Sequence, residues 1–105
     1  MRVIAFETIT VDNTVKTLTL ANYNPETIKL TGDVIAGPAA QITAEGGDMR
    51  YRLDGTDPTA SIGHLLKSGD TLKLRDLIFL KNFKVIRTGS VSGTLSITYV
   101  DGQDL

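Results

Sequence analysis

Apolar and polar residues alternate with a period of two over several short stretches of this sequence, and turn-forming residues separate the stretches. The clearest case is the stretch from residue 94 to residue 100, where Leu95, Ile97 and Tyr99 alternate with hydroxyl-bearing residues. A period of two places successive side chains on opposite faces of a β-strand. Helical periodicity is weak throughout, so the pattern predicts an all-β chain.

The pattern predicts about eight strands with turn residues between them, which is typical of a two-sheet sandwich. The expected strands are Val3–Val11, Val15–Leu20, Thr27–Thr31, Ala40–Ala44, Asp48–Leu53, Thr71–Leu74, Asn82–Thr88 and Thr94–Val100. We therefore expect a single antiparallel β-sandwich of roughly seven to nine strands, immunoglobulin-like or jelly-roll-like. It forms one domain over residues 1–105, with a short polar tail at residues 101–105.

Turn residues suggest how these strands are joined. Gly46-Gly47 tolerates left-handed backbone angles and so predicts a hairpin between Ala40–Ala44 and Asp48–Leu53. Ser61–Lys67 is expected to form one helical or 3₁₀ turn. Its apolar residues, expected in the core, are Ile62, Leu65 and Leu66. The remaining expected connections are the turns Asp12-Asn13 and Ser68–Asp70, the loop Asn22–Glu26 and the crossing segment Gly32–Pro38.

Residues 49–59 combine a strand with a tight turn. The apolar Met49, Tyr51 and Leu53 alternate with two arginines, so one face of the strand is apolar and the other is charged. The next residues favour a turn, because glycine tolerates positive φ and proline keeps the residue before it out of helical angles. We expect a rigid structural corner made by Tyr51, Asp54, Gly55, Asp57, Pro58 and Thr59.

Composition narrows the function classes. The 105 residues hold 11 basic and 12 acidic side chains, and proteins that bind nucleic acids normally show a basic excess. The absence of cysteine excludes thiol catalysis and disulfides, and an aromatic content of 6% predicts an aliphatic core. The apolar run at the amino terminus is too short for a secretion signal or a membrane span. We expect production in a cytoplasm, with no nucleic-acid or membrane partner.

His64 is the single histidine of the chain. A histidine base needs a carboxylate that orients it and a nucleophile within reach. Ser61 and Ser68 lie near it in the sequence, and Asp57 and Asp70 flank the segment. The nucleophile-elbow motif G-x-S-x-G is missing, so the sequence favours a structural histidine that anchors its loop by hydrogen bonds to the backbone.

Other candidate chemical groups also favour structural roles. Asp54 and Asp57 resemble half of a calcium loop, but the EF-hand spacing needs a terminal glutamate that is absent, so we expect both to cap backbone amides of the turn. The tyrosines that might stack on a sugar are Tyr23, Tyr51 and Tyr99, and the last two stand at inward strand positions. We expect no catalytic, cofactor-binding or metal-binding residue, no small-molecule substrate and no enzymatic activity.

Basic side chains exceed acidic ones between Lys67 and Arg87. They form either a patch that meets an acidic partner or the solvated faces of strands, where lysine also prevents unwanted sheet pairing. The possible partner contacts are Arg50, Arg52, Lys73, Arg75, Lys84 and Arg87.

Several short runs between Ala39 and Val100 resemble small structural proteins encoded by tailed bacteriophages and prophages. The runs are Ile42–Glu45, Met49–Thr59, Gly63-His64, Leu66, Gly69-Asp70, Asn82-Phe83, Ile86-Arg87 and Leu95–Tyr99. A second resemblance covers Tyr51–Thr59, whose pattern Y-x-x-D-G-x-x-P-T is similar to a structural strand–turn in immunoglobulin-like accessory domains of chitin- and hexosamine-degrading enzymes. It implies a sandwich and no sugar chemistry.

The bacteriophage resemblance implies a virion structural protein that decorates or cements the capsid shell. Its partners are then the major capsid protein or other virion proteins. It also implies a homo-oligomer, with a trimer as the first expectation, made in the host cytoplasm and located in the virion. The alternatives left open are a head–tail connector or tail component, and a module that binds glycans or a host surface.

Overall fold

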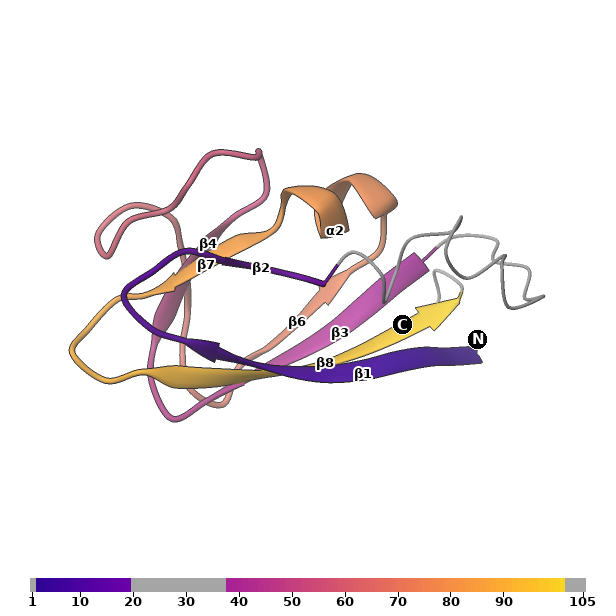
Figure 1. The fold of residues 1–105 in the computed structure, drawn as a ribbon, viewed down its shortest axis with the longest axis horizontal. Helices are drawn as coiled ribbons and strands as arrows, with labels where there is room; N and C mark the ends of the chain where they lie inside the picture. Colours follow the sequence, from indigo (N-terminus) through magenta and orange to yellow (C-terminus); the bar gives the residue numbers. More distant parts are fainter. Residues whose placement is uncertain (1, 20–37, 102–105) are drawn as a thin grey trace.

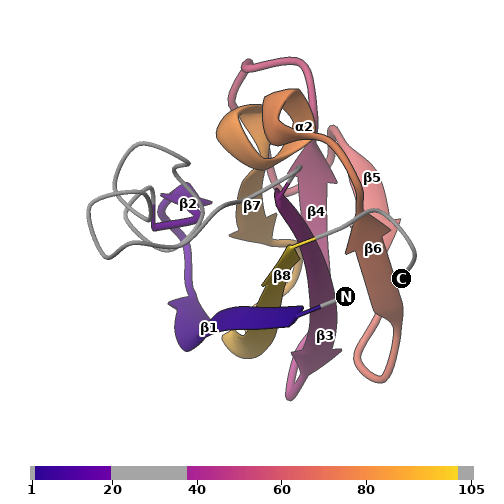
Figure 2. The same ribbon diagram turned by 90° about the vertical axis from the view of Figure 1, so that its right-hand side faces the viewer.

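The computed structural model of the chain describes residues 2–19 and 38–101. Antiparallel strands of this part form two four-stranded sheets, A and B, which confirms the expected all-β, sandwich-like fold (Figures 1 and 2). Sheet A has the order β1 (Arg2–Val11), β8 (Gly93–Asp101), β3 (Pro38–Glu45), β6 (Thr71–Leu74). Sheet B has the order β2 (Lys16–Thr17), β7 (Lys84–Arg87), β4 (Met49–Arg52), β5 (His64–Leu66).

The core lies between the two sheets and is mainly aliphatic. Leu95, Ile97 and Tyr99 of β8 are fully buried, as their alternation predicted. Met49 and Val85 of sheet B are buried in the same cluster. Removing apolar surface from water is the main favourable term in folding, at roughly 1.5–3 kcal/mol for each large aliphatic side chain. The period-two pattern of β8 therefore decides which side of sheet A meets sheet B.

Most strands that the sequence predicted are confirmed to within two residues at each end. They are β1, β3, β4, β6, β7 and β8. The second predicted strand is shorter than expected: β2 covers Lys16–Thr17, and Leu18 just beyond it is buried. The predictions for residues 20–37, including Tyr23, lie outside the described residues.

The predicted hairpin around Gly46-Gly47 is wrong. The chain enters this turn from β3 in sheet A and leaves it into β4 in sheet B, so the two strands do not pair with each other. Gly46 does adopt the left-handed φ of 82° that the turn prediction required. A glycine turn shows that the chain changes direction, but it does not show whether the strands on either side share a sheet.

The helical turn predicted at Ser61–Lys67 is also wrong. Residues 64–66 form β5, which pairs with β4 so that Leu66 lies opposite Met49 and His64 opposite Tyr51. Leu66 is buried, whereas Ile62 and Leu65, which were expected in the core, are exposed. The spacing of Ile62, Leu65 and Leu66 fits a helix and a strand equally. Residues 64–66 form a strand because they pair with the side of β4 that β7 does not occupy.

Leu77–Asn82 forms the short helix α2, although the sequence showed little helical periodicity. The helix connects β6 of sheet A to β7 of sheet B (Figures 1 and 2). Leu80 is buried and Leu77 packs on the core, while Ile78 and Phe79 between them are exposed. Leu77 and Leu80 are three residues apart and therefore lie on the same side of the helix, which faces the core. Because all four residues of this run are apolar, the sequence conceals that spacing.

We predict that Gly93→Ala destabilises the fold, because an added Cβ would lie 2.8 Å from the carbonyl oxygens of Glu45 and Gly47 and from Met49 Cε. Two of these atoms belong to backbone that cannot move without disturbing the sheet crossing. We expect a loss of roughly 1–3 kcal/mol in the free energy of unfolding, measured by urea denaturation. Gly89→Ala is the control, since its Cβ would meet nothing within 4 Å. Equal urea midpoints for the two variants would contradict the packing described here.

Candidate functional site

Residues 53–63 fold back over the outer face of sheet B and are held there by Arg50. The Arg50 Nη1 group donates to the Gly63 carbonyl at 3.0 Å, and its Nε group donates to the Ala60 carbonyl at 3.2 Å. Nε also lies 3.3 Å from the hydroxyl of Thr88. Pro58, a member of this loop, is buried. The charged face of β4, which the sequence left open for a partner, thus binds the chain's own loop.

The expected corner forms through short-range polar contacts. Asp54 accepts a hydrogen bond from the Thr56 amide at 3.2 Å, which confirms its predicted capping role. It also pairs with Arg52, whose Nε group donates at 3.1 Å. The hydrogen bond from Arg52, followed by that from Thr56, lowers the pKa of Asp54, and the same pairing raises the pKa of Arg52. Thr59 Oγ1 accepts from the Ile62 amide at 3.0 Å, so the corner is closed at both ends.

Asp57 does not cap the turn in the way the sequence predicted. Its carboxylate instead pairs with Lys84 Nζ of β7 at 2.9 Å, across the outer face of sheet B. Gly55 adopts a φ of 81°, which confirms the need for glycine in the turn. Gly63 has a φ of 138°, and a Cβ there would lie 3.1 Å from the Tyr51 carbonyl, so the loop lies close against β4.

His64 lies on the exposed strand β5, beside Tyr51. The two ring centroids are 5.3 Å apart, and Tyr51 stacks in turn against Phe83 at 5.7 Å. Within the described residues the His64 side chain makes no hydrogen bond, so the predicted anchoring through the backbone is replaced by ring packing against Tyr51. Burial raises the pKa of Tyr51. Tyr51 thus lies between the rings of His64 and Phe83.

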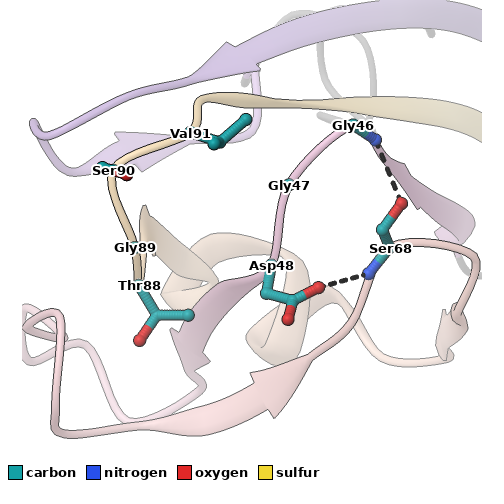
Figure 3. A pocket seen from close by; sticks show the side chains of 8 residues that line it. All are labelled: Gly46, Gly47, Asp48, Ser68, Thr88, Gly89, Ser90 and Val91. Carbon is teal, nitrogen blue, oxygen red and sulfur yellow. Dashed lines mark hydrogen bonds between the residues drawn. The ribbon is translucent and has the colours of Figure 1, made fainter.

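A hollow of about 370 Å³ lies where the chain crosses between the sheets. Figure 3 shows its lining, which is made by Gly46, Gly47, Asp48, Ser68, Thr88, Gly89, Ser90 and Val91. The Gly46 amide donates to the Ser68 hydroxyl at 3.1 Å, and the Ser68 amide donates to the Asp48 carboxylate at 2.9 Å. These two bonds connect Gly46–Asp48, where the chain passes from sheet A to sheet B, to the turn between β5 and β6.

The hollow offers a carboxylate and three hydroxyls, which suit a small polar or cationic group. Several of these groups are already used to hold the chain. Asp48 binds the Ser68 amide, and the Thr88 hydroxyl binds the Ala60 carbonyl and Arg50. The sequence analysis did not identify this hollow, and only the glycine pair marked its position.

The basic residues between Lys67 and Arg87 do not gather on one face. Lys73 lies on β6 of sheet A, whereas Lys84 and Arg87 lie on β7 of sheet B. Arg75 follows β6 and is exposed. Arg87 Nη1 donates to the Ser92 hydroxyl at 3.2 Å, and Lys84 is paired with Asp57. Their role as partner contacts stays a prediction, and the two sheets divide them between separate surfaces.

The outer face of sheet A is a broad and nearly uncharged surface. Its central row places Thr8, Ser96, Thr43 and Thr71 side by side across all four strands. The other residues that alternation places on this face are Val3, Phe6, Thr10, Ala39, Gln41, Glu45, Lys73, Thr94, Thr98 and Val100, and of these Ala39 and Val100 are buried. Glu45 and Lys73 are its only charged members among the described residues. The alternation along β8 indicated part of this face, but the order of the strands was needed to assemble it.

Among the described residues, no three histidine, aspartate or glutamate side chains come together as a metal site would require. That part of the chain also holds no helix with the length and apolarity of a membrane crossing. Comparison of the chain with protein-family models, with curated proteins and with solved structures gave no match.

We predict that Arg50→Met loosens residues 53–63 and that Arg52→Met does not. Arg50 holds two backbone carbonyls of the loop, whereas Arg52 makes a solvent-exposed pair with Asp54. The first variant should lose about 1–3 kcal/mol in the free energy of unfolding. The second should change it little, because exposed ion pairs contribute little to stability. Limited proteolysis should cut the loop faster in Arg50→Met alone. Equal rates in both variants would show that Arg50 does not hold the loop.

The lowered pKa of Asp54 predicts a contribution to stability that depends on pH. The folded chain keeps this carboxylate ionised at a lower pH than the unfolded chain does, so its stabilisation is present above the unfolded pKa. The stabilisation is lost as the pH falls through the folded pKa. Titration of the Asp54 carboxyl by NMR should therefore give a midpoint below the ordinary aspartate value.

The matched variant for this titration is Arg52→Met, which removes the main cause of the shift and should raise the Asp54 midpoint. Arg50→Met, which leaves the Arg52–Asp54 pair in place, should not change it. An unshifted midpoint in the unaltered chain would refute the proposed role of this pair.

Proposed function

We propose that this chain is a structural protein of a tailed-bacteriophage particle and that it decorates or cements the capsid shell through protein–protein contacts. The sequence resemblance between Ala39 and Val100 suggests this class of protein. The surface that supports the proposal best is the outer face of sheet A. In this proposal the chain is made in the host cytoplasm, forms a homo-oligomer and resides in the virion.

The single observation that carries the proposal is the lack of charge over the centre of that face. The central row of Thr8, Ser96 and Thr43, continued by Thr71, contains hydroxyl groups and methyl groups only. Solvent-facing surfaces usually mix charges of both signs, whereas the cores of protein interfaces are depleted of charged side chains. A partner can cover this row without leaving a buried charge unpaired.

The proposed mechanism is stabilisation of the shell by mass action. A protein that binds the assembled shell, but not its separate subunits, shifts the equilibrium toward the assembled state. The outer face of sheet A would lie on the major capsid protein or on another virion protein. The opposite side of the sandwich, where Arg50 and Lys84 hold residues 53–63, would point away from the shell.

We predict that Ser96→Lys weakens binding to the shell and leaves the fold intact. Ser96 lies in the middle of the central row, so a lysine there would place a charge in the contact. Binding of purified chain to particles that lack it should weaken at least about tenfold. Ser61→Lys, which adds the same charge to the exposed loop over sheet B, should bind normally. Equal binding by both variants would exclude this face as the shell contact.

The copy number in purified particles separates the proposed role from its alternatives. Decoration or cementing requires roughly tens to hundreds of copies, because shell positions repeat with the shell's symmetry. About a dozen copies or fewer would indicate a head–tail connector or a tail component. Absence from the particle, together with binding to glycans or host cells, would indicate a surface-binding module instead.

A further inference from the structure

The four edge strands of the two sheets are protected unequally. β2 has 2 residues, β5 has 3 and β6 has 4. Each of these short edges also carries or adjoins a lysine, namely Lys16, Lys67 and Lys73. Short length and lysine are two means by which natural sheets avoid pairing at their edges. β1, the fourth edge, has 10 residues and no lysine, and it carries only a register irregularity between Val3 and Ala5 and the inward-facing Glu7 as protection.

The sequence of β1 contains neither lysine nor proline, and Glu7 is its one charged residue between Val3 and Val11. The Glu7 carboxylate accepts hydrogen bonds from the Tyr99 hydroxyl and from Thr19, so it is held within the chain. β8 pairs with β1 along one side over its full length. No described strand pairs along the other side (Figures 1 and 2).

Two large apolar side chains are exposed on this strand. Val3 is 65% exposed and Phe6 is 62% exposed. They lie on the same outer face because a register irregularity between Val3 and Ala5 shifts the alternation: Val3 lies opposite Val100 and Phe6 opposite Thr98. An open strand edge next to exposed apolar side chains is the arrangement that adds a further strand to a sheet.

We propose that a second copy of this chain pairs with β1 as an antiparallel strand, about a two-fold axis between Val3 and Phe6. Val3 of one copy then lies opposite Phe6 of the other, twice in each dimer. In this register each outward-facing residue of the paired segment lies opposite an outward-facing residue of the other copy, and Ile4 lies opposite Ala5. Along the backbone, Arg2 then falls opposite Glu7.

A second copy fits this edge better than a different partner because the surface is self-complementary. Antiparallel pairing of one strand with itself is isologous and closes as a two-fold dimer. A trimer, which the sequence resemblance led us to expect, would need β1 to meet a different edge of the next copy, and the other edges are short and carry or adjoin lysine. The dimer would join two copies of sheet A into one sheet and double the uncharged outer face.

The first test is the mass of the chain in solution, measured by sedimentation from about 1 μM to about 1 mM. The unaltered chain should form a dimer, and Phe6→Lys should raise the dissociation constant at least about tenfold. Thr71→Lys, an exposed position on the opposite edge of sheet A, should dimerise normally. A monomer at every concentration, a trimer, or a dimer unaffected by Phe6→Lys would overturn the proposal.

Cysteine cross-linking tests the register directly, because the chain has no cysteine of its own. Directly opposite residues of antiparallel strands bring their Cβ atoms close enough to bridge, with a short linker where needed. A mixture of Val3→Cys and Phe6→Cys chains should therefore cross-link, while each variant alone should not. Cross-linking within Phe6→Cys alone would contradict this register.

These tests do not depend on the particle. A chain that dimerises through β1 but is absent from purified particles would contradict the proposed function alone. A chain that is abundant in particles but monomeric in solution would contradict the edge pairing alone.

Discussion

Burial of one side of β8 between the two sheets is the constraint on which the rest of the structure depends. Leu95, Ile97 and Tyr99 are excluded from water, and their position fixes the register of β1 on one side and β3 on the other. A shift of one residue would turn this apolar row outward, so the register is strongly determined. The same alternation places Thr94, Ser96 and Thr98 on the outer face. The core and the uncharged surface are thus two consequences of one pattern.

The two sides of the sandwich differ in how their polar groups are used. On sheet B, Arg50, Arg52 and Lys84 bind carbonyl and carboxylate groups of residues 53–63, so their charge serves the chain itself. On sheet A, hydroxyl side chains cover the outer face, and β1 has an edge along which no described strand pairs. This asymmetry is the reason that sheet A, rather than the arginine-rich strand β4, carries both the proposed shell contact and the proposed dimer contact.

The sequence predicted the strands better than their connections. Alternation located β8 and β1, because burial of one face leaves a direct period of two in the sequence. It could not show that Gly46-Gly47 crosses between sheets, since glycine angles do not specify pairing partners. It also could not separate helix from strand at Leu77–Leu80, where every position is apolar, or show that Asp57 pairs with Lys84. The row of hydroxyl groups on sheet A depends on strand order, which a single sequence does not contain.

The most direct measurement of the central proposal, that β1 is the edge through which sheet A self-associates, is amide hydrogen exchange as a function of protein concentration. Protection of residues 3–7 should increase as the concentration rises, because new backbone hydrogen bonds form along β1. The opposite edge, β6, should exchange at a constant rate in the same samples. Exchange of β1 that does not change with concentration, or that changes equally along β6, would contradict the account.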